Sequence, residues 1–392
     1  MGDHRWRAPF KPVIEQKLLV DALTAHTAPR ALQTEAAECF TLDDLLKILR
    51  THRVDWPRLR FFSGGSAVPH ENLGLYVDRR SGAPYWQPDQ GALQAQMNTG
   101  LTIVLDRVDQ LDDRVLAHCL QLEAMLDAPV FANAYASWGS VAGFGRHWDD
   151  HDVLAWQLNG TKQWELWAPT RTRPRFLDVE APTEPDGEPD ATVQLNSGDL
   201  LCVPAGWWHT VWPVNEPSLH ITFGIERPTG VDLLKWLADT AVEHDQLRQP
   251  LDLTPDGEQS ATMQALERWL SAQALGRALV EEYLDHLGAT APARPWLTPP
   301  VSNSQALPPS RAVYWLVPRA RLHQGSDYLH LHADGQAIDL DTAAAPVLEH
   351  LKKQPVTTVD ELQRVGTISD ADLDTLLAEL ARLGIVGIDP DV

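Results

Sequence analysis

Residues 146–167 read RHWDDHDVLAWQLNGTKQWELW and residues 198–213 read GDLLCVPAGWWHTVWP, and these two stretches decide the fold. On a β-strand, His147 and Asp149 would point to the same face because side chains alternate along it. An imidazole and a carboxylate presented together make most of a metal site, and His209 can supply the third ligand. Two His and one carboxylate leave part of the coordination sphere open. That arrangement suits non-heme Fe(II), which binds a co-substrate and O₂ at the same time.

The setting of His209 separates a metal site from a chance His-x-Asp, which occurs in many proteins. Gly198 starts a turn before the apolar run at residues 200–203. Pro204 and Gly206 then end one strand and start the next sharply, which re-aims the side chains that follow. A His delivered by such a corner is favoured as a ligand over a core imidazole.

A rival for the third ligand is His220, on the strand expected at residues 218–225. It shares a face with Thr222. Because His220 lacks the Pro-Gly corner that precedes His209, we interpret it as a structural imidazole or one that orients a ligand. Thr222 is a candidate for holding the co-substrate.

The Asn-Gly pair at residues 159–160 lies between two apolar runs, which is the strongest short signal for a β-hairpin. A two-residue loop would pair Gln157 with Lys162, and Ala155 with Trp164. Lys162 would then share an apolar face with Trp164, where a cation is costly unless an anion meets it. The alternative is a Lys at the barrel rim that reaches solvent.

The same stretches carry a family resemblance. The second cupin motif is matched at four positions, although Pro213 replaces the usual Asn: Gly198, Pro204, Gly206 and His209. A longer block resembles the Jumonji-C, or cupin-4, oxygenases: Asn133-x-Tyr135, His147-x-Asp149, Asp152-Val153 and Gln157-Leu158-x-Gly160-x-Lys162-x-Trp164. Within that group the chain is most similar to the ribosomal oxygenases, which hydroxylate side chains of ribosomal proteins. The resemblance is specific over about residues 96–226 and loose elsewhere.

The resemblance implies an α+β protein built on a double-stranded β-helix, the cupin or JmjC barrel, that uses Fe(II), 2-oxoglutarate and O₂. His147, Asp149 and His209 would hold Fe(II). Lys162 occupies the family position that binds the far carboxylate of 2-oxoglutarate. The positions that match family residues lining the co-substrate or substrate pocket are Asn133 and Tyr135. Five tryptophans are candidates for dry walls around the site, although large aromatics are ordinarily core: Trp148, Trp156, Trp164, Trp207 and Trp208.

The composition bounds the partners and the compartment. The 392 residues carry a formal net charge of −22, which would attract a basic partner and makes nucleic-acid binding unlikely. An acidic proteome would explain the same charge. Three lone cysteines, with no Cys-x-x-Cys, favour a reducing compartment. Residues 1–12 lack the apolar core of a secretory signal and no run approaches membrane-spanning length, so we expect a soluble cytoplasmic protein.

Patterning along the chain divides it into five parts. These are a mixed N-terminal segment (residues 1–95) with a helix at residues 13–27, the catalytic barrel (residues 96–230), a helical segment (residues 231–290), a Pro-rich linker (residues 291–310) and a winged-helix-like domain (residues 311–392). The last helical stripe should end at Gly288.

Two of these parts suggest contacts with other chains. Helices after the barrel build a dimer interface in the ribosomal oxygenases, so the resemblance implies a homodimer; an intramolecular cover for the barrel is the alternative. Residues 311–392 contain 7 Lys or Arg against 13 Asp or Glu, which is not the basic face that a DNA reader needs. We therefore interpret this domain as a protein-contact or structural module.

The activity expected from these features is hydroxylation of an amino-acid side chain, His or Arg favoured, in a basic protein or peptide, with a ribosomal protein as one candidate. Residues 168–191 form a Pro- and charge-rich excursion, interpreted as a mobile lid or substrate-contact loop, with a plain solvated linker as the alternative. The rival functions are hydroxylation of a biosynthetic precursor peptide, N-methyl demethylation, a metal-dependent reaction without 2-oxoglutarate, and a non-catalytic cupin adaptor.

Overall fold

The structure is a computed structural model that describes residues 29–33, 39–77, 85–176, 178, 180–214, 217–251, 261–273, 276–299, 306–366 and 368–389. The helix expected at residues 13–27 lies outside these ranges. The described residues up to Glu226 form one compact unit, and most of those from Arg227 onward form a second. None of the helices in the described ranges combines the length and apolar character that crossing a bilayer needs.

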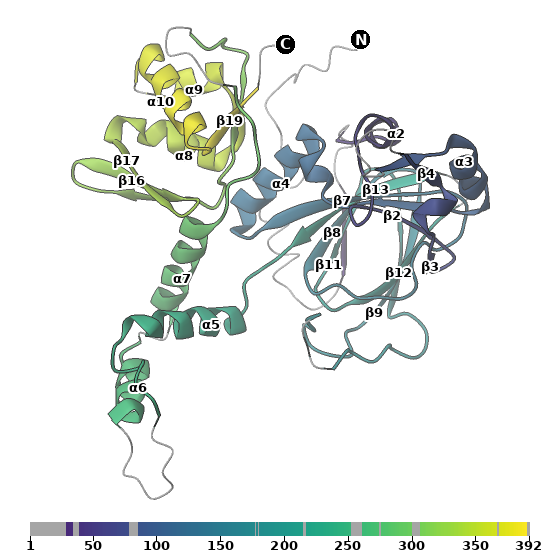
Figure 1. Cartoon of the computed structure of the whole chain (residues 1–392), viewed down its shortest axis with the longest axis horizontal. Coiled ribbons are helices and arrows are strands. Elements are labelled where there is room, and N and C mark those ends of the chain that lie inside the picture. The colour runs from purple at the N-terminus through teal and green to yellow at the C-terminus, as the bar shows by residue number, and fades with distance from the viewer. Residues whose placement is uncertain are drawn as a thin grey trace, which may run out of the picture. The chain divides into compact units, whose positions relative to one another are not determined.

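The first unit is built on an eight-stranded sheet. Its strands are β1 (Arg30–Gln33), β2 (Leu59–Ser63), β3 (Ser66–Ala67), β6 (Thr102–Leu105), β7 (Val130–Ser137), β8 (Asp152–Asn159), β11 (Asp199–Val203) and β13 (Ser218–Ile225). They are hydrogen-bonded in the order β1-β11-β8-β13-β7-β6-β2-β3 (Figure 1). The strand expected at residues 218–225 is confirmed as β13, and the apolar run at residues 200–203 lies in β11.

A three-stranded sheet forms the other wall of the barrel. Its strands are β9 (Lys162–Trp167), β10 (Ala191–Leu195) and β12 (Trp208–Pro213), in the order β10-β9-β12. Val153 and Ala155 of β8 meet Trp164 and Leu166 of β9 in one buried apolar cluster. The two sheets therefore pack face to face around a common interior.

The hairpin predicted around residues 159–160 is wrong. β8 hydrogen-bonds β11 along one edge and β13 along the other, so neither edge is left for β9. β9 pairs instead with β10 and β12, which sets Lys162 opposite Leu195 and Pro213. The Asn-Gly turn carries the chain from one sheet to the other. Lys162 and Trp164 still share the buried face of β9 because side chains alternate along a strand.

The same alternation puts core and pocket on opposite faces of the large sheet. On β13, Leu219, Ile221 and Phe223 join the apolar core beneath the sheet, whereas His220 and Thr222 line the barrel interior. The strand is buried along its whole length. A polar residue on its inner face therefore meets protein or a ligand rather than bulk water.

Helices cover the outer face of the large sheet. They are α2 (Leu42–Thr51), α3 (Gln90–Thr99) and α4 (Asp113–Leu126), and a two-stranded hairpin of β4 (Gly74–Val77) and β5 (Tyr85–Pro88) lies between α2 and α3 in the chain. Thr41 and Asp44 form a capping box at the start of α2. Leu45 of α2 and Val115 of α4 contribute to the core under the sheet.

The second unit begins with helices, as predicted: α5 (Gly230–Thr240), α6 (Ala261–Ala272) and α7 (Arg277–Thr290). The expectation that the last of them ends at Gly288 is wrong, since α7 continues to Thr290. A Cβ atom on Gly288 would lie 2.3 Å from the carbonyl oxygen of Arg319. This glycine therefore allows two backbones to approach closely and does not end the helix.

The remainder of the second unit combines two small sheets with three helices. The strands are β14 (Ala312–Trp315), β15 (Arg321–Gln324), β16 (Tyr328–Ala333), β17 (Gln336–Asp341), β18 (Val356–Thr358) and β19 (Val386–Ile388), and the helices are α8 (Ala345–Lys353), α9 (Val359–Val365) and α10 (Asp370–Arg382). The sheet orders are β18-β14-β19 and β15-β16-β17. Thr358 and Glu361 form a capping box at the start of α9.

Candidate metal centre

His147 and Asp149 reach the site from a short connection and not from a strand. The backbone N–H of His147 donates to the carbonyl of His209 at 3.1 Å, and the N–H of His209 donates back at 2.7 Å. This is a single isolated β-bridge, and β8 begins only at Asp152. The prediction that His147 and Asp149 share a strand is therefore wrong, because the chain bends at residues 150–151 before pairing resumes.

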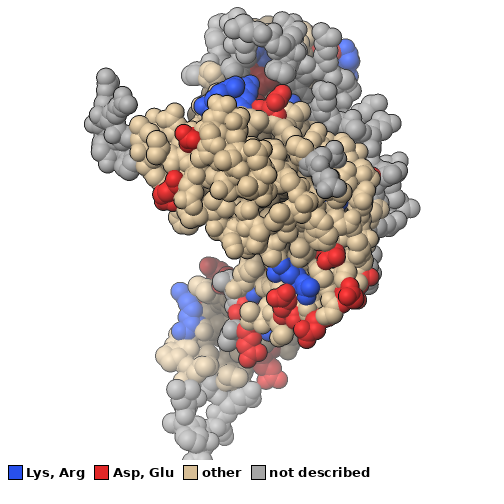
Figure 2. Space-filling view, turned by 90° about the vertical axis from the view of Figure 1, so that its right-hand side faces the viewer, with Lys and Arg blue, Asp and Glu red and all other residues tan. Residues whose placement is uncertain are grey.

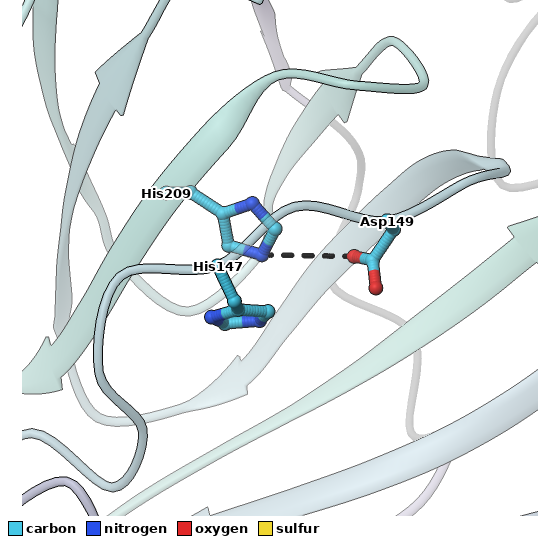
Figure 3. Close-up of side chains that lie close together, drawn as sticks. All are labelled: His147, Asp149 and His209. Carbon is cyan, nitrogen blue, oxygen red and sulfur yellow. Dashed lines mark ion pairs between the residues drawn. The ribbon is translucent and has the colours of Figure 1, made fainter. Parts of the chain in front are cut away.

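The structure nevertheless brings the three predicted ligands together (Figure 3). Nε2 of His209 lies 3.7 Å from a carboxylate oxygen of Asp149, and the ring centroids of His147 and His209 are 4.2 Å apart. One potential ligand atom from each residue lies within 4.8 Å of the others. Two imidazoles and a carboxylate thus point toward one another, as a single ion would require.

Backbone carbonyls orient both imidazoles. Nδ1 of His147 is 3.0 Å from the carbonyl oxygen of Gly145, and Nδ1 of His209 is 3.2 Å from that of Trp207. A carbonyl only accepts, so each Nδ1 carries the proton and each Nε2 keeps a lone pair for a metal. Burial, together with the nearby His147 and against the opposing effect of Asp149, lowers the pKa of His209 to about 4. The ring is therefore in its neutral, metal-binding form at pH 7.

The Pro-Gly corner that aims His209 depends on Gly206. This residue has a φ of 88°, a backbone conformation that favours glycine. A Cβ atom there would lie 2.5 Å from Cδ of Pro174. Its N–H also donates to the carbonyl of Asp149 at 2.8 Å, so the corner is fastened to the segment that carries the carboxylate.

The three side chains open into a cavity between the two sheets. Six of the seven predicted site residues line it: Tyr135, His147, Asp149, Lys162, His209 and Thr222. Asn133 does not line it. Its side-chain oxygen accepts from the backbone N–H of Arg107 at 3.0 Å. Asn133 is therefore directed to Arg107 and not into the cavity.

Lys162 lies inside the barrel and not at its rim, with 2% of its surface exposed. Its Nζ donates to the carbonyl of Tyr135 at 3.1 Å and lies 2.8 Å from Nδ1 of His220. In the described ranges no carboxylate forms an ion pair with it, and burial lowers the pKa of the amine to about 7. A charged amine buried without a counter-charge is costly, so an anion bound in the cavity would stabilise it.

Aromatic residues complete the wall beside the ligands, and sequence reasoning found only part of it. Phe144, which was missed, lies 5.5 Å from the ring of His147 and 4.1 Å from that of Phe62. Its signal is a lone aromatic in the glycine-rich loop just before His-x-Asp. Of the five candidate tryptophans, Trp164 lines the cavity, stacked 5.6 Å from His209. Trp156 points the other way, into the core under the large sheet.

The excursion at residues 168–191 is fastened to the segment that precedes the ligands. The guanidinium of Arg146 lies 3.8 Å from the ring centroid of Trp167 and donates to the carbonyl of Pro185. Phe176 stacks on Trp148 at 4.7 Å. The excursion therefore lies next to the site rather than apart from it.

Comparison with known proteins bears on these features. Residues 104–233 match the family model described as JmjC domain. The chain is 28% identical over 253 residues to "Bifunctional lysine-specific demethylase and histidyl-hydroxylase NO66" of Brugia malayi, a match that covers 60% of this chain and 32% of that protein. For the protein of the same description in Dictyostelium discoideum the identity is 35% over 199 residues, covering 47% and 35%. The matches thus span about a third of the length of these two curated relatives.

A solved structure shows the same fold over nearly the whole chain. It is "Structure of YcfD a Ribosomal oxygenase from Escherichia coli in complex with Cobalt and 2-oxoglutarate", with a TM-score of 0.57 at 16% identity. The alignment covers 93% of this chain and 96% of that one. At this identity the likeness establishes the fold alone, a JmjC or cupin barrel combined with helices and further sheets.

Proposed function

Because the chain carries a JmjC domain at residues 104–233, we propose that it is an Fe(II)- and 2-oxoglutarate-dependent oxygenase that hydroxylates an amino-acid side chain in a protein or peptide. One observation carries the proposal. The three convergent side chains His147, Asp149 and His209 open into the same cavity as the amine of Lys162, which has no carboxylate partner among the described residues. Such a co-substrate needs two fixed points: a metal ion that one end of the dicarboxylate chelates, and a cation that pairs with the carboxylate at the other end.

Each residue of the cavity then has a role. His147, Asp149 and His209 would hold Fe(II), and Lys162 would pair with the distal carboxylate of 2-oxoglutarate. Tyr135 and Thr222 would contact the co-substrate or substrate. The solved YcfD complex with cobalt and 2-oxoglutarate supports both the metal and the co-substrate, since cobalt takes ligand sets that also suit iron.

Bound Fe(II) would supply the redox chemistry: 2-oxoglutarate, O₂ and a C–H bond give succinate, CO₂ and the hydroxylated product. The protein positions the co-substrate and excludes water. Val153 and Trp164 present apolar surface to the cavity and lie in the cluster between the sheets, which keeps the site dry.

A basic protein or peptide is the proposed substrate, with His or Arg as the modified residue. The relatives' printed descriptions name histidyl hydroxylation and lysine demethylation, and YcfD is described as a ribosomal oxygenase. The net charge of −22 favours a cationic polypeptide and disfavours nucleic acid. Figure 2 shows acidic side chains, with basic ones beside them, at the lower right of that view. Five exposed acids belong to the excursion beside the site: Glu180, Glu184, Asp186, Glu188 and Asp190.

We further propose the architecture around the site. The barrel is a double-stranded β-helix in residues 96–230, preceded by residues 1–95. The helices of residues 231–290 serve a homodimer, which is supported by exposed apolar side chains such as Leu234, Val242 and Leu270. Residues 291–310 are a linker, and residues 311–392 form a winged-helix-like module for protein contact. A cytoplasmic location fits the buried free cysteines among the described residues.

Mass spectrometry tests the proposed function. Purified protein is incubated with ribosomal proteins, Fe(II), 2-oxoglutarate and O₂, with His147→Ala as the control. The expected result is the gain of one oxygen on a His or Arg, with succinate released in equal amount, from the wild type only. Release of formaldehyde would instead support the demethylase reaction that the relatives' description names. Turnover of a substrate without succinate would indicate a cupin that does not use 2-oxoglutarate, and no reaction on any polypeptide would favour an adaptor.

A further inference from the structure

His220 and Lys162 form a buried polar pair on the wall of the cavity. His220 is 4% exposed and lies on the inner face of β13, and its Nδ1 is 2.8 Å from Nζ of Lys162. The carbonyl of Tyr135 is the second contact of the amine, at 3.1 Å. These are the two hydrogen-bond contacts of the Lys162 amine among the residues that the structure describes.

The frame that holds His220 is rigid. In the sheet it lies directly opposite Tyr135 on β7 and Gln157 on β8. Its ring stacks on that of Tyr135 at 4.7 Å with an interplanar angle of 9°, and Trp164 lies 5.7 Å from it. The imidazole therefore cannot turn away from Lys162 without breaking packing inside a fully buried sheet.

The chemistry of the pair fixes its roles. A lysine ammonium has three N–H donors and no acceptor, so Nδ1 of His220 must accept and the ring must be neutral. Burial and the adjacent charge of Lys162 keep the pKa of His220 well below its ordinary value, which agrees with a neutral ring. Two of the three N–H groups of the ammonium are used by His220 and Tyr135, which leaves one for an acceptor in the cavity.

We propose that His220 is a positioning residue that holds the Lys162 ammonium with one N–H directed into the cavity, so that the site selects a 2-oxo acid with a distal carboxylate. This inference rests on the proposed function and names what makes that site selective. The metal ligands are separate from it, since His220 is not among the three residues that converge on the candidate metal position. Loss of the acceptor should therefore weaken binding of the distal carboxylate without weakening metal binding.

The test compares two substitutions by calorimetry with Co²⁺-loaded protein. His220→Phe keeps a ring to stack on Tyr135 but removes the acceptor, whereas His220→Asn keeps an acceptor near the position of Nδ1. The two probes are 2-oxoglutarate and 2-oxopentanoate, which has the same chain length and no distal carboxylate. A hydrogen bond to a charged group suggests that His220→Phe weakens 2-oxoglutarate binding on the order of 10- to 100-fold. Binding of 2-oxopentanoate and of Co²⁺ should not change, and His220→Asn should stay close to wild type.

A steady-state measurement gives an independent readout. In a succinate-release assay, His220→Phe should raise the KM for 2-oxoglutarate and leave kcat nearly unchanged, because the contact is made equally in the ground and transition states. Nitrogen NMR of the wild type tests the pair without any substitution: the His220 ring should be neutral, with its proton on Nε2.

Distinct results would overturn the inference. Equal affinity of wild type and His220→Phe for 2-oxoglutarate would overturn it. An equal loss of affinity for 2-oxoglutarate and for 2-oxopentanoate would also overturn it, because that result would indicate a merely structural role for His220. A proton on Nδ1 of His220 would also do so, even if the Phe variant does not fold. Wild-type protein that binds Co²⁺ but not 2-oxoglutarate would overturn the proposed function as well, which separates the two failures.

Discussion

Replacing Lys162 by Met should make the protein more stable and unable to bind 2-oxoglutarate. The amine is 2% exposed, and burial lowers its pKa from 10.5 to about 7. In the unfolded chain the same group is protonated at pH 7. A difference of this size penalises the folded state by about 4 kcal/mol at pH 7. Removing the Lys162 amine leaves Nδ1 of His220 and the carbonyl of Tyr135 without their hydrogen-bond donor, which costs about 2 kcal/mol in total.

The expected net effect is a gain of about 2 kcal/mol in the free energy of unfolding at pH 7. The sign follows from linkage: because the pKa is lower in the folded state, the unfolded state binds more protons between pH 7 and 10.5, and wild-type stability rises with pH across that window. Lys162→Met lacks this rise. The advantage of the variant should therefore shrink as the pH approaches 10.

Urea denaturation of metal-free protein at several pH values measures the stability, and calorimetry measures 2-oxoglutarate binding. Losing one partner of a buried charge pair should weaken that binding by about 3 kcal/mol or more, which is at least 100-fold. The reasoning is refuted if Lys162→Met is less stable than wild type at pH 7, or if the variant binds 2-oxoglutarate as tightly as wild type.

Three further predictions follow from other parts of the site. Gly206→Ala should destabilise the protein and weaken Co²⁺ binding, because the new Cβ atom would lie 2.5 Å from Pro174 and the backbone φ of 88° is strained for alanine. The matched control is Gly187→Ala, which has a φ of 91° and no atom within 4 Å of the new Cβ atom. The control should show only the backbone strain, of about 1 kcal/mol. Similar effects of the two substitutions would contradict the corner argument. The stability of the metal-free protein should fall as the pH drops from 6.5 to 4, because His209 has a lower pKa in the folded state and the unfolded state therefore binds more protons in this pH range. Denaturation midpoints that stay constant over this range would contradict a buried neutral His209. Arg146→Ala should speed proteolytic cleavage within residues 168–191, since the guanidinium contacts Trp167 and Pro185, and unchanged cleavage would show that Arg146 does not hold the excursion.

The sequence was sufficient where the constraint is local or tied to one strand. The Pro-Gly corner before His209 and the alternation along β9 and β13 are properties of a few consecutive residues, so the positions of His209, Lys162 and Thr222 could be predicted. The capping boxes at Thr41 and Thr358 are equally local.

The failures have a common physical cause, which is competition for partners distant in the sequence. The Asn-Gly signal correctly marks a turn, but β8 is already paired on both edges by β11 and β13, and no local pattern reports that. Asn133 shares its side of β7 with Tyr135, yet the backbone N–H of Arg107 captures its side chain. The strand expected through His147 and Asp149 likewise fails, because His147 pairs with the distant His209 in a single isolated bridge.

The most direct test of the account is anomalous diffraction from crystals grown with Co²⁺ and 2-oxoglutarate. The account predicts one strong cobalt peak per chain, within bonding distance of Nε2 of His147, a carboxylate oxygen of Asp149 and Nε2 of His209. The distal carboxylate of 2-oxoglutarate should lie within hydrogen-bonding distance of Nζ of Lys162. A cobalt peak elsewhere, or no peak at these three side chains, would contradict it.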